Sequence, residues 1–187
     1  MPSNVGRPRR ASAELLQEAA FELFQLRGYR QTSVELIAKT AGFSRATFFN
    51  FFSSKAELFW VETDKLIHSL GNHLALCAGR DPVPTLRAAL LEFAEGLTSA
   101  AVPWALQNYR LLEAADDLVA SGAGRAIGLN RMFQGYLRRR APEISSSAQA
   151  EAATVLALLL TALMAWVDAG VERGSLAAHL EPLLVRE

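Results

Sequence analysis

The sequence predicts an all-α protein. Apolar residues recur at the spacing of one helix face along most of the 187-residue chain, and these runs end at glycine or proline. No segment alternates polar and apolar residues with the period of two that a half-buried strand requires, and there is no internal repeat. We therefore expect about nine helices, divided into a three-helix N-terminal domain over residues 1–53 and a helical bundle over residues 54–187.

The first expected helix follows an N-terminal arm that contains proline and arginine. The arm spans residues 1–10, and the helix runs from about Ser12 to Arg27. Its apolar residues recur at i, i+4 and i+8 and form one core-facing stripe opposite a face rich in glutamate. The members of the stripe are Leu15, Leu16, Ala19, Ala20, Leu23 and Phe24.

Two short helices joined by a glycine turn are expected between Thr32 and Phe52. Thr32 is placed to cap the first helix, and Glu35 three residues later completes a capping box. Gly42 follows the last apolar position, where a left-handed residue ends a helix without a steric penalty. Ser44 is the expected cap of the second helix. This arrangement predicts a DNA-binding helix-turn-helix.

The second short helix is the expected recognition helix. Phe48, Phe51 and Phe52 are expected to face the core, which leaves the residues at the start of the helix exposed. A helix of this length fits the major groove of B-DNA, where short side chains permit close approach and an arginine pairs with a guanine edge. The expected base contacts are Arg45, Ala46 and Thr47.

Taken together, these residues resemble the TetR/AcrR-type one-component transcriptional regulators. The resemblance covers roughly the first third of the chain and implies DNA binding controlled by an effector, as in most family members. It is carried by Arg9 and Arg10, Gly28-Tyr29, Thr32-Ser33, Ile37-Ala38, Ala41-Gly42, Ser44, Phe48 to Phe52, Ser54-Lys55 and Glu57-Leu58.

Two positions depart from the family pattern, which commonly has tyrosine at Phe49 and tyrosine or histidine at Phe51. The hydroxyl contacts to phosphate that those residues imply are missing here. Affinity for the DNA backbone is therefore expected to depend more on the other polar residues. The expected phosphate contacts are Arg9, Arg10, Thr32, Ser33, Ser44, Phe49, Asn50 and Lys55.

The rest of the chain predicts further helices. Ser54 and Glu57 have the spacing of a second capping box, so a fourth helix is expected from Ser54 to about Cys77 as the link between the domains. A loop rich in glycine and proline follows. The remaining helices are expected over residues 85–97, 103 to about 119, 124–140, 146 to about 173 and 175–184.

The helix that begins at Ser146 is apolar on all sides. From Ala152 to Val167 only Thr154 and Thr161 are polar, but sixteen residues are too few to span a membrane. A helix of this kind is typical of a core or of a subunit interface. We expect a homodimer, with no membrane contact, formed through Leu156, Leu159, Leu160 and Leu163.

Large apolar and aromatic side chains are frequent in the bundle. They suit the walls of a pocket for a small, largely apolar effector, and tryptophan and tyrosine add a polar group that orients a ligand. Ordinary packing of a helical bundle uses the same residues, so both interpretations stay open. The candidate ligand-binding residues are Phe93, Leu97, Trp104, Tyr109, Phe133, Met164 and Trp166.

Signals for catalysis or metal binding are weak. No Gly-rich phosphate loop, nucleophile elbow or paired His-Glu motif occurs, so we expect neither an enzyme nor a cofactor. His73 and Cys77 lie four residues apart, but two ligands do not complete a zinc site, and the pair is assigned to structure. The acidic cluster Glu113, Asp116 and Asp117 is interpreted as a solvated face.

Charge and cysteine content agree with a cytoplasmic DNA-binding protein. Residues 1–60 carry eight Lys/Arg against five Asp/Glu, whereas residues 61–187 carry eleven against fourteen, so the positive part contains the helix-turn-helix. The single cysteine, Cys77, excludes an intramolecular disulfide, and no signal-peptide pattern is found.

The sequence thus predicts a transcriptional regulator, most simply a repressor that a small apolar effector releases from a palindromic double-stranded operator. The alternative is an architectural or partner-regulated DNA-binding protein without a small-molecule effector. A roomy apolar pocket in the bundle favours the first function, and a closed bundle favours the second.

Overall fold

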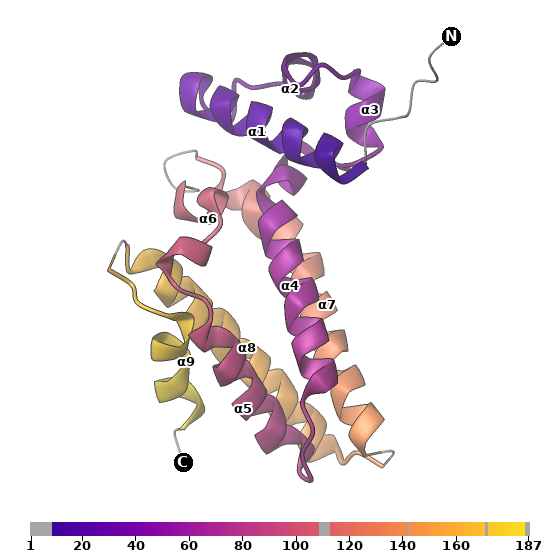
Figure 1. Cartoon of the computed structure of the whole chain (residues 1–187), viewed down its shortest axis with the longest axis vertical. Helices are drawn as coiled ribbons and strands as arrows, with labels where there is room; N and C mark the ends of the chain where they lie inside the picture. The colour runs from indigo at the N-terminus through magenta and orange to yellow at the C-terminus, as the bar shows by residue number, and fades with distance from the viewer. Residues whose placement is uncertain (1–8, 109–112, 142, 171, 186–187) are drawn as a thin grey trace. The chain divides into compact units, whose positions relative to one another are not determined.

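The protein is all-α, as the sequence predicts. The computed structural model describes residues 9–108, 113–141, 143–170 and 172–185, and of residues 9–12, 104 and 105 it describes the backbone only. Within these ranges the chain forms nine α-helices and two 3₁₀ helices, and it contains no strand (Figure 1).

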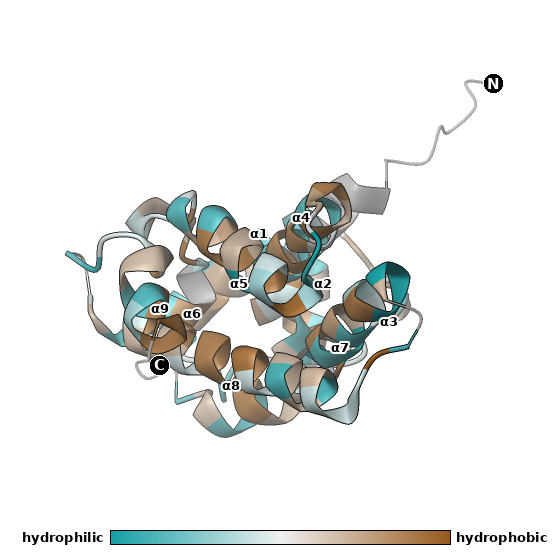
Figure 2. Cartoon of the chain, turned by 90° about the horizontal axis from the view of Figure 1, so that it is seen from below, coloured by the Kyte–Doolittle hydropathy of each residue, from teal (hydrophilic) through white to brown (hydrophobic). Residues whose placement is uncertain are grey.

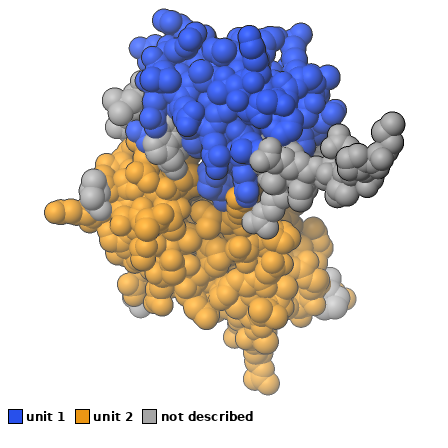
Figure 3. Space-filling view, turned by 45° about the horizontal axis from the view of Figure 1, so that its top comes forward, with its two compact units in different colours: residues 1–63, 108–121 blue, residues 64–107, 122–187 orange. Residues whose placement is uncertain are grey.

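Contacts along the chain divide it into two compact units (Figure 3). Unit 1 contains Met1–Thr63 and Asn108–Ser121, and unit 2 contains Asp64–Gln107 and Gly122–Glu187. Residues 108–121 therefore group with the N-terminal helices although they are distant in sequence.

Unit 1 is built around three helices and an aromatic core. Helix α1 (Arg9–Arg27) packs against α2 (Val34–Thr40), α2 packs against α3 (Arg45–Phe49), and a 3₁₀ helix, η1 (Lys55–Trp60), returns to α1. The core contains buried phenylalanines from α1, α3 and η1, together with a buried tyrosine. These residues are Phe24, Tyr29, Phe48 and Phe59.

The cap of α2 differs from the expected one. Ser33, not Thr32, is the N-cap, and its hydroxyl accepts a hydrogen bond from the backbone N–H of Leu36. Thr32 is buried instead, and its hydroxyl donates to the carbonyl of Gly28. The expected capping box of Thr32 and Glu35 is therefore wrong, because the Thr32 hydroxyl is used to close the end of the preceding helix.

Unit 2 contains most of the long helices. These are α4 (Val61–Leu76, whose first three residues belong to unit 1), α5 (Pro82–Glu95), α7 (Ala115–Arg140), α8 (Ser146–Asp168) and α9 (Leu176–Leu184), with the short η2 (Ser99–Ala101) and α6 (Trp104–Asn108). Helix α9 packs against both α5 and α8, and α5 also contacts α8. The boundary between the units falls within α7, between Ser121 and Gly122.

Several expected helix ends are wrong. The segment expected as helices over 103–119 and 124–140 forms the short α6 and then one continuous helix, α7, which passes through the glycines that were expected to interrupt it. Helix α8 ends at Asp168 and not near Arg173, because Gly170 takes a left-handed φ of 77° directly after the last turn.

Helix α8 is longer than the sixteen-residue apolar core read from the sequence. It has 23 residues, and an 18-residue window has a mean hydropathy of 1.9, so its length and composition satisfy the criteria for a membrane span. Core helices of soluble proteins meet the same criteria, so these criteria are weak evidence for a membrane span. The expectation that this segment is too short to span a membrane is nevertheless wrong for the full helix of 23 residues. Figure 2 shows hydrophobic, brown faces on α8 and α9.

Candidate nucleic-acid interface

The turn between α2 and α3 has the geometry expected of a helix-turn-helix. Gly42 adopts φ 77°, a conformation in which a Cβ atom is strained. Its N–H donates to the carbonyl of Lys39, and the N–H of Phe43 donates to the carbonyl of Ala38, so both bonds close the end of α2. The prediction of a left-handed glycine at this position is confirmed.

Ser44 starts α3 as expected. Its side chain accepts a hydrogen bond from the Thr47 N–H at 3.0 Å, and its hydroxyl lies 2.9 Å from the Thr47 hydroxyl. On the inner side of the helix, Phe48 is completely buried. On the outer side, Arg45 and Ala46 are exposed and Thr47 is half-exposed. The three expected base contacts thus lie on the accessible side of a short, anchored helix.

Arg45 has two partners within unit 1. Its Nε lies 2.7 Å from a carboxylate oxygen of Glu35 on α2, and its guanidinium lies 5.3 Å from the centre of the Phe49 ring. The pKa of Glu35 is lowered, first by its backbone N–H, then by the Ser33 hydroxyl, and also by the charge of Arg45. Because the Arg45 side chain is 64% exposed, this ion pair is open to competition by phosphate or base edges.

The expected phosphate contacts on α2 and α3 have different environments. Ser33, Ser44, Phe49 and Asn50 are exposed, and the oxygens of Ser33 and Ser44 each cap a helix. Thr32 is 1% exposed and its hydroxyl is bonded internally, so its expected side-chain contact with phosphate is wrong. Arg9 and Arg10 lie in the first turn of α1, but their side chains are outside the described part of the chain.

Lys55 is held by the fold of unit 1. Its ammonium donates to the carbonyls of Tyr29 and Thr32 at 2.6 and 3.0 Å, and it lies 3.9 Å from the centre of the Tyr29 ring. Burial lowers the pKa of Lys55, and the nearby Asp117 carboxylate acts in the opposite direction. The phosphate contact expected of Lys55 stays a prediction, with the addition that this side chain also joins two loop carbonyls.

The acidic cluster at the start of α7, which was expected to be a solvated face, also makes contacts within unit 1. Asp117 accepts a 2.7 Å hydrogen bond from the Tyr29 hydroxyl, and Glu113 lies 3.6 Å from Arg30. Burial strongly raises the pKa of Tyr29, and the hydrogen bond and charge of Asp117 raise it further. A groove of about 430 Å³ lies here, lined by Tyr29, Ser54, Lys55, Ala56, Glu57, Asp117, Ala120 and Ser121. No local pattern signals these contacts, because the partners are about 90 residues apart.

The candidate ligand residues of unit 2 do not form one accessible group. Phe133 and Trp166 are 0% and 1% exposed, and the Trp166 indole N–H already donates to the carbonyl of Gly174. Phe93 and Leu97 are half-buried, while Met164 is 51% exposed. The expectation placed on Tyr109 and on the Trp104 side chain falls outside the described residues.

Two of the four expected dimer contacts on α8 are buried within their own chain, and the dimer itself stays a prediction. Leu156 and Leu159 are 8% and 9% exposed and pack in the core of their own chain, whereas Leu160 and Leu163 are half-buried. The accessible face of α8 is rotated from the expected one, because α5 and α9 cover the leucine face.

Comparisons with known proteins agree with this geometry. A family model described as "Bacterial regulatory proteins, tetR family" matches residues 16–60. A Mycobacterium tuberculosis protein named as a mycofactocin biosynthesis transcriptional regulator, MftR, is 34% identical over 98 residues, which cover 49% of this chain. The match spans 46% of that relative, or about half of its length.

A solved structure extends the likeness to almost the whole chain. It is that of Thermus thermophilus FadR, a TetR-family transcriptional repressor, in complex with lauroyl-CoA, with 29% identity and a TM-score of 0.59. The similarity covers 94% of this chain and 96% of that one. The region that contains the helix-turn-helix, residues 16–60, therefore matches the TetR family of bacterial regulatory proteins, and the fold of almost the whole chain is similar to that of a TetR-family repressor.

Proposed function

We propose that the protein is a cytoplasmic repressor that binds a palindromic DNA operator as a homodimer and leaves it when a small, largely apolar effector binds. The observation that carries the proposal is the start of α3, where Arg45 and Ala46 are exposed on a helix anchored by the buried Phe48. Ser44 and Gly42 hold the two helix ends at this turn, so the groove-facing residues are presented on a rigid support.

Arg45, Ala46 and Thr47 are the proposed base contacts. Arginine pairs with the O6 and N7 atoms of guanine, and alanine permits close approach of the helix to the base edges. The proposed phosphate contacts are Arg9, Arg10, Ser33, Ser44, Phe49, Asn50 and Lys55, with Phe49 contributing its exposed ring edge and not a polar atom.

A homodimer is supported by the accessible face of α8. Only 33% of its most apolar 18-residue window is buried within the chain. Ala153, Ala157, Leu160 and Met164 lie at successive spacings of four, three and four residues, which places them on one face. The hydroxyls of Thr154 and Thr161 donate to carbonyls of their own helix, so they add little polarity. A second copy of α8 is the proposed cover.

The effector class is suggested by FadR, which was solved with lauroyl-CoA. A long acyl chain matches the apolar character of unit 2, and we propose Phe93 and Leu97 as the side chains it first meets. Phe133 and Trp166 are accessible only to a ligand that selects a more open conformation, because both are packed here. A ten- to hundredfold preference for that conformation, about 1.4–2.7 kcal/mol per site, is sufficient to empty a marginally occupied operator.

The burial of Phe133 and Trp166 also favours the second candidate function, an architectural or partner-regulated DNA-binding protein. If unit 2 stays closed, it offers no site for a small molecule. The accessible face of α8 then has only the role of joining two copies of the chain. The two functions share the helix-turn-helix and differ only in their response to ligands.

One experiment tests both steps. Duplexes selected from a random pool by the protein are expected to converge on an inverted repeat whose half-sites lie about 34–36 Å apart. Fluorescence anisotropy then measures operator affinity with and without lauroyl-CoA, with free CoA as the matched control. If the selection recovers no preferred sequence, the proposal of a sequence-specific regulator is contradicted. If a preferred site is found but the affinity for it does not change with a series of acyl-CoA chains, the architectural alternative is favoured.

A further inference from the structure

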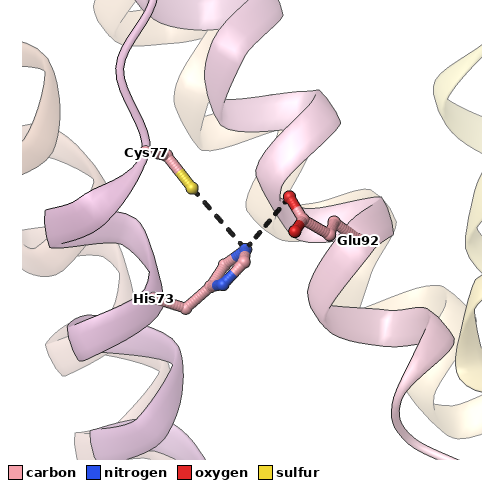
Figure 4. A group of neighbouring side chains, drawn as sticks. All are labelled: His73, Cys77 and Glu92. Atoms are coloured by element: carbon pink, nitrogen blue, oxygen red, sulfur yellow. Dashed lines mark hydrogen bonds and ion pairs between the residues drawn. The ribbon is translucent and has the colours of Figure 1, made fainter.

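Three potential metal ligands from α4 and α5 converge in unit 2 (Figure 4). The Nε2 atom of His73 lies 3.6 Å from the Sγ of Cys77 and 3.7 Å from a carboxylate oxygen of Glu92. All three ligand atoms lie within 4.8 Å of one another. The sequence offered only His73 and Cys77, and the fold supplies the third residue, Glu92, from α5.

The surrounding residues hold this group in position. His73 lies in the last turn of α4 and Cys77 directly follows the helix, and because the Cys77 N–H still donates to the carbonyl of His73, the two residues share one side of the helix end. The His73 ring packs against Phe93, and Arg140 donates to the carbonyls of Leu74 and Cys77. The ring contact joins the end of α4 to α5, and the Arg140 hydrogen bonds join it to α7, so the positions of His73 and Cys77 do not depend on a metal.

We propose that His73, Cys77 and Glu92 form a binding site for a borderline divalent cation, with Zn²⁺ as the preferred ion. One thiolate, one imidazole and one carboxylate are the three ligand types that zinc takes in proteins. The two negative ligands balance the charge of the ion, which makes a half-buried location acceptable. Three protein ligands leave a fourth position for water or an exogenous ligand, as in open zinc sites.

The observed distances are close to those of a tetrahedral site. Bond lengths of about 2.0–2.3 Å at tetrahedral angles place ligand atoms about 3.3–3.8 Å apart. The two contacts of His73, at 3.6 and 3.7 Å, fit this range directly. The Sγ of Cys77 and the carboxylate of Glu92 lie within 4.8 Å of each other, and Glu92 has room to adjust because its side chain is 71% exposed.

Metal binding competes with a simpler hydrogen-bonded state. The Nε2 of His73 also lies 3.1 Å from the carbonyl of Ala89, so in the metal-free protein an Nε2–H can donate to that oxygen. A metal bound at Nε2 requires the proton to be on Nδ1 instead. The proposed ion therefore replaces one link between α4 and α5 with another that also includes Cys77 and Glu92.

Cobalt provides a direct test on the full-length, untagged protein. Co²⁺ is titrated into metal-free protein while the thiolate-to-cobalt charge-transfer absorption is followed, and Zn²⁺ is then added as a competitor. We expect the band to reach its plateau at one Co²⁺ per chain and to be abolished by Zn²⁺. Thermal unfolding should show a rise in Tm with Zn²⁺ but not with Mg²⁺, because only the folded chain assembles the three ligands.

Variants identify the ligands. Cys77→Ser should abolish the charge-transfer band, and Glu92→Gln should weaken Co²⁺ affinity at least tenfold while leaving the band, since only Cys77 supplies sulfur. The matched controls are His68→Gln and Glu95→Gln, exposed residues of α4 and α5 outside the group, which should leave affinity unchanged.

Three results would overturn the proposal: the absence of a thiolate band, a plateau at one ion per two chains, or unchanged affinity in Glu92→Gln. Because Glu92 is exposed, Glu92→Gln should fold normally, and its circular dichroism spectrum checks this. None of these measurements uses DNA or an acyl effector, so the metal site is tested separately from the proposed repressor function.

Discussion

At the scale of single residues, Tyr29 and Lys55 show how burial and charge act together in unit 1. Tyr29 is 3% exposed, and its hydroxyl donates to the Asp117 carboxylate. Burial raises the pKa of Tyr29 because it favours the neutral phenol over the phenolate, and the neighbouring carboxylate favours the phenol further. The same burial disfavours the charged form of Lys55, which donates to the Tyr29 carbonyl.

The first prediction concerns stability at alkaline pH. A tyrosine in the unfolded chain ionises near pH 10, whereas the pKa of Tyr29 in the folded protein is raised, so the folded state retains a proton that the unfolded state loses. Stability should therefore fall as pH rises above about 10. Lys55 has the opposite effect on the pH dependence of stability, because its pKa is lowered and the folded state therefore loses this proton before the unfolded state does. This contribution stops changing with pH once the lysine of the unfolded chain is also neutral.

Tyr29→Phe should reduce the alkaline loss of stability, measured by urea unfolding from about pH 8 to about pH 11, and should cost about 1 kcal/mol at neutral pH. The matched control for Tyr29→Phe is Tyr136→Phe. Burial also raises the pKa of Tyr136, but the buried Tyr136 hydroxyl has no hydrogen-bond partner among the described residues. Its removal should reduce the alkaline loss without a cost at neutral pH. A steep alkaline loss that persists in the double variant contradicts the assignment.

The second prediction separates DNA recognition from stability at Arg45. Arg45→Ala should weaken binding to the selected operator by about 1–3 kcal/mol and relax the preference at one base pair. The free energy of unfolding should change by less than about 1 kcal/mol, since the ion pair with Glu35 is exposed. Equal losses on operator and random DNA would show that Arg45 contacts only the backbone.

Glu35→Gln is the companion variant to Arg45→Ala. Its neutral side chain no longer holds Arg45 by charge and no longer repels phosphate, so affinity for DNA should rise. Glu22→Gln, an exposed acid on α1, controls for the change in net charge. An equal gain from both variants would show that only net charge matters.

At the scale of elements, the two short helices depend on how their ends are held. Helices of seven and five residues are too short to be stable alone, so caps and packing determine whether they form. Gly42 is the critical position because the chain reverses there with φ 77°.

The third prediction compares two glycines. Gly42→Ala should destabilise the protein by about 1–2 kcal/mol, because a residue with a Cβ is strained in the left-handed conformation. Gly124→Ala is the control, since Gly124 has helical φ within α7 and free space around a Cβ. It should stabilise the protein by about 0.5–1 kcal/mol. Thermal or urea unfolding measures both, and equal effects would show that φ at Gly42 is not limiting.

The sequence predicts these elements well where the signal is local. The glycine turn, the Ser44 cap and the inward Phe48 follow from residue type and spacing. The N-cap of α2 was predicted wrongly because threonine and serine both cap helices well, and Thr32 and Ser33 are neighbours. Ser33 is the cap because the Thr32 hydroxyl donates to the carbonyl of Gly28 instead.

Contacts between distant segments could not be predicted in this way. Tyr29 contacts Asp117, and His73 contacts Glu92, because the segments that carry these residues pack together. The spacing of residues along the chain gives no sign of such packing. The continuous helix α7 was missed for a related reason, since tertiary contacts outweigh the low helix propensity of its glycines. The fold class could therefore be predicted from the sequence. The candidate site could be predicted only where its residues are close in sequence and belong to one motif.

At the scale of the whole molecule, assembly determines whether one motif becomes a specific reader of DNA. A single helix-turn-helix contacts one half-site, and two related by a twofold axis contact successive major grooves. The accessible face of α8, with Ala157, Leu160 and Met164, is the surface proposed for this role.

The fourth prediction tests that face. Met164→Glu should convert the proposed dimer into a monomer at micromolar concentration, measured by light scattering, because a buried unpaired carboxylate is unfavourable at an apolar interface. Operator affinity should fall as a consequence, while circular dichroism stays unchanged. Leu26→Glu, which adds the same charge at an 80% exposed residue of α1, should remain dimeric. A monomeric parent protein would refute the interface.

Helix α7 has a consequence for local opening. Its sequence contains glycine at positions 122, 124, 128 and 135, and the boundary between the two units falls at the first of them. Each interior glycine weakens a helix by about 0.5–1 kcal/mol relative to alanine, so the backbone hydrogen bonds around residues 122–128 should open more often than those near Phe133. Amide hydrogen exchange should therefore divide this one continuous helix into a slowly exchanging half at its buried end and a rapidly exchanging stretch at the boundary.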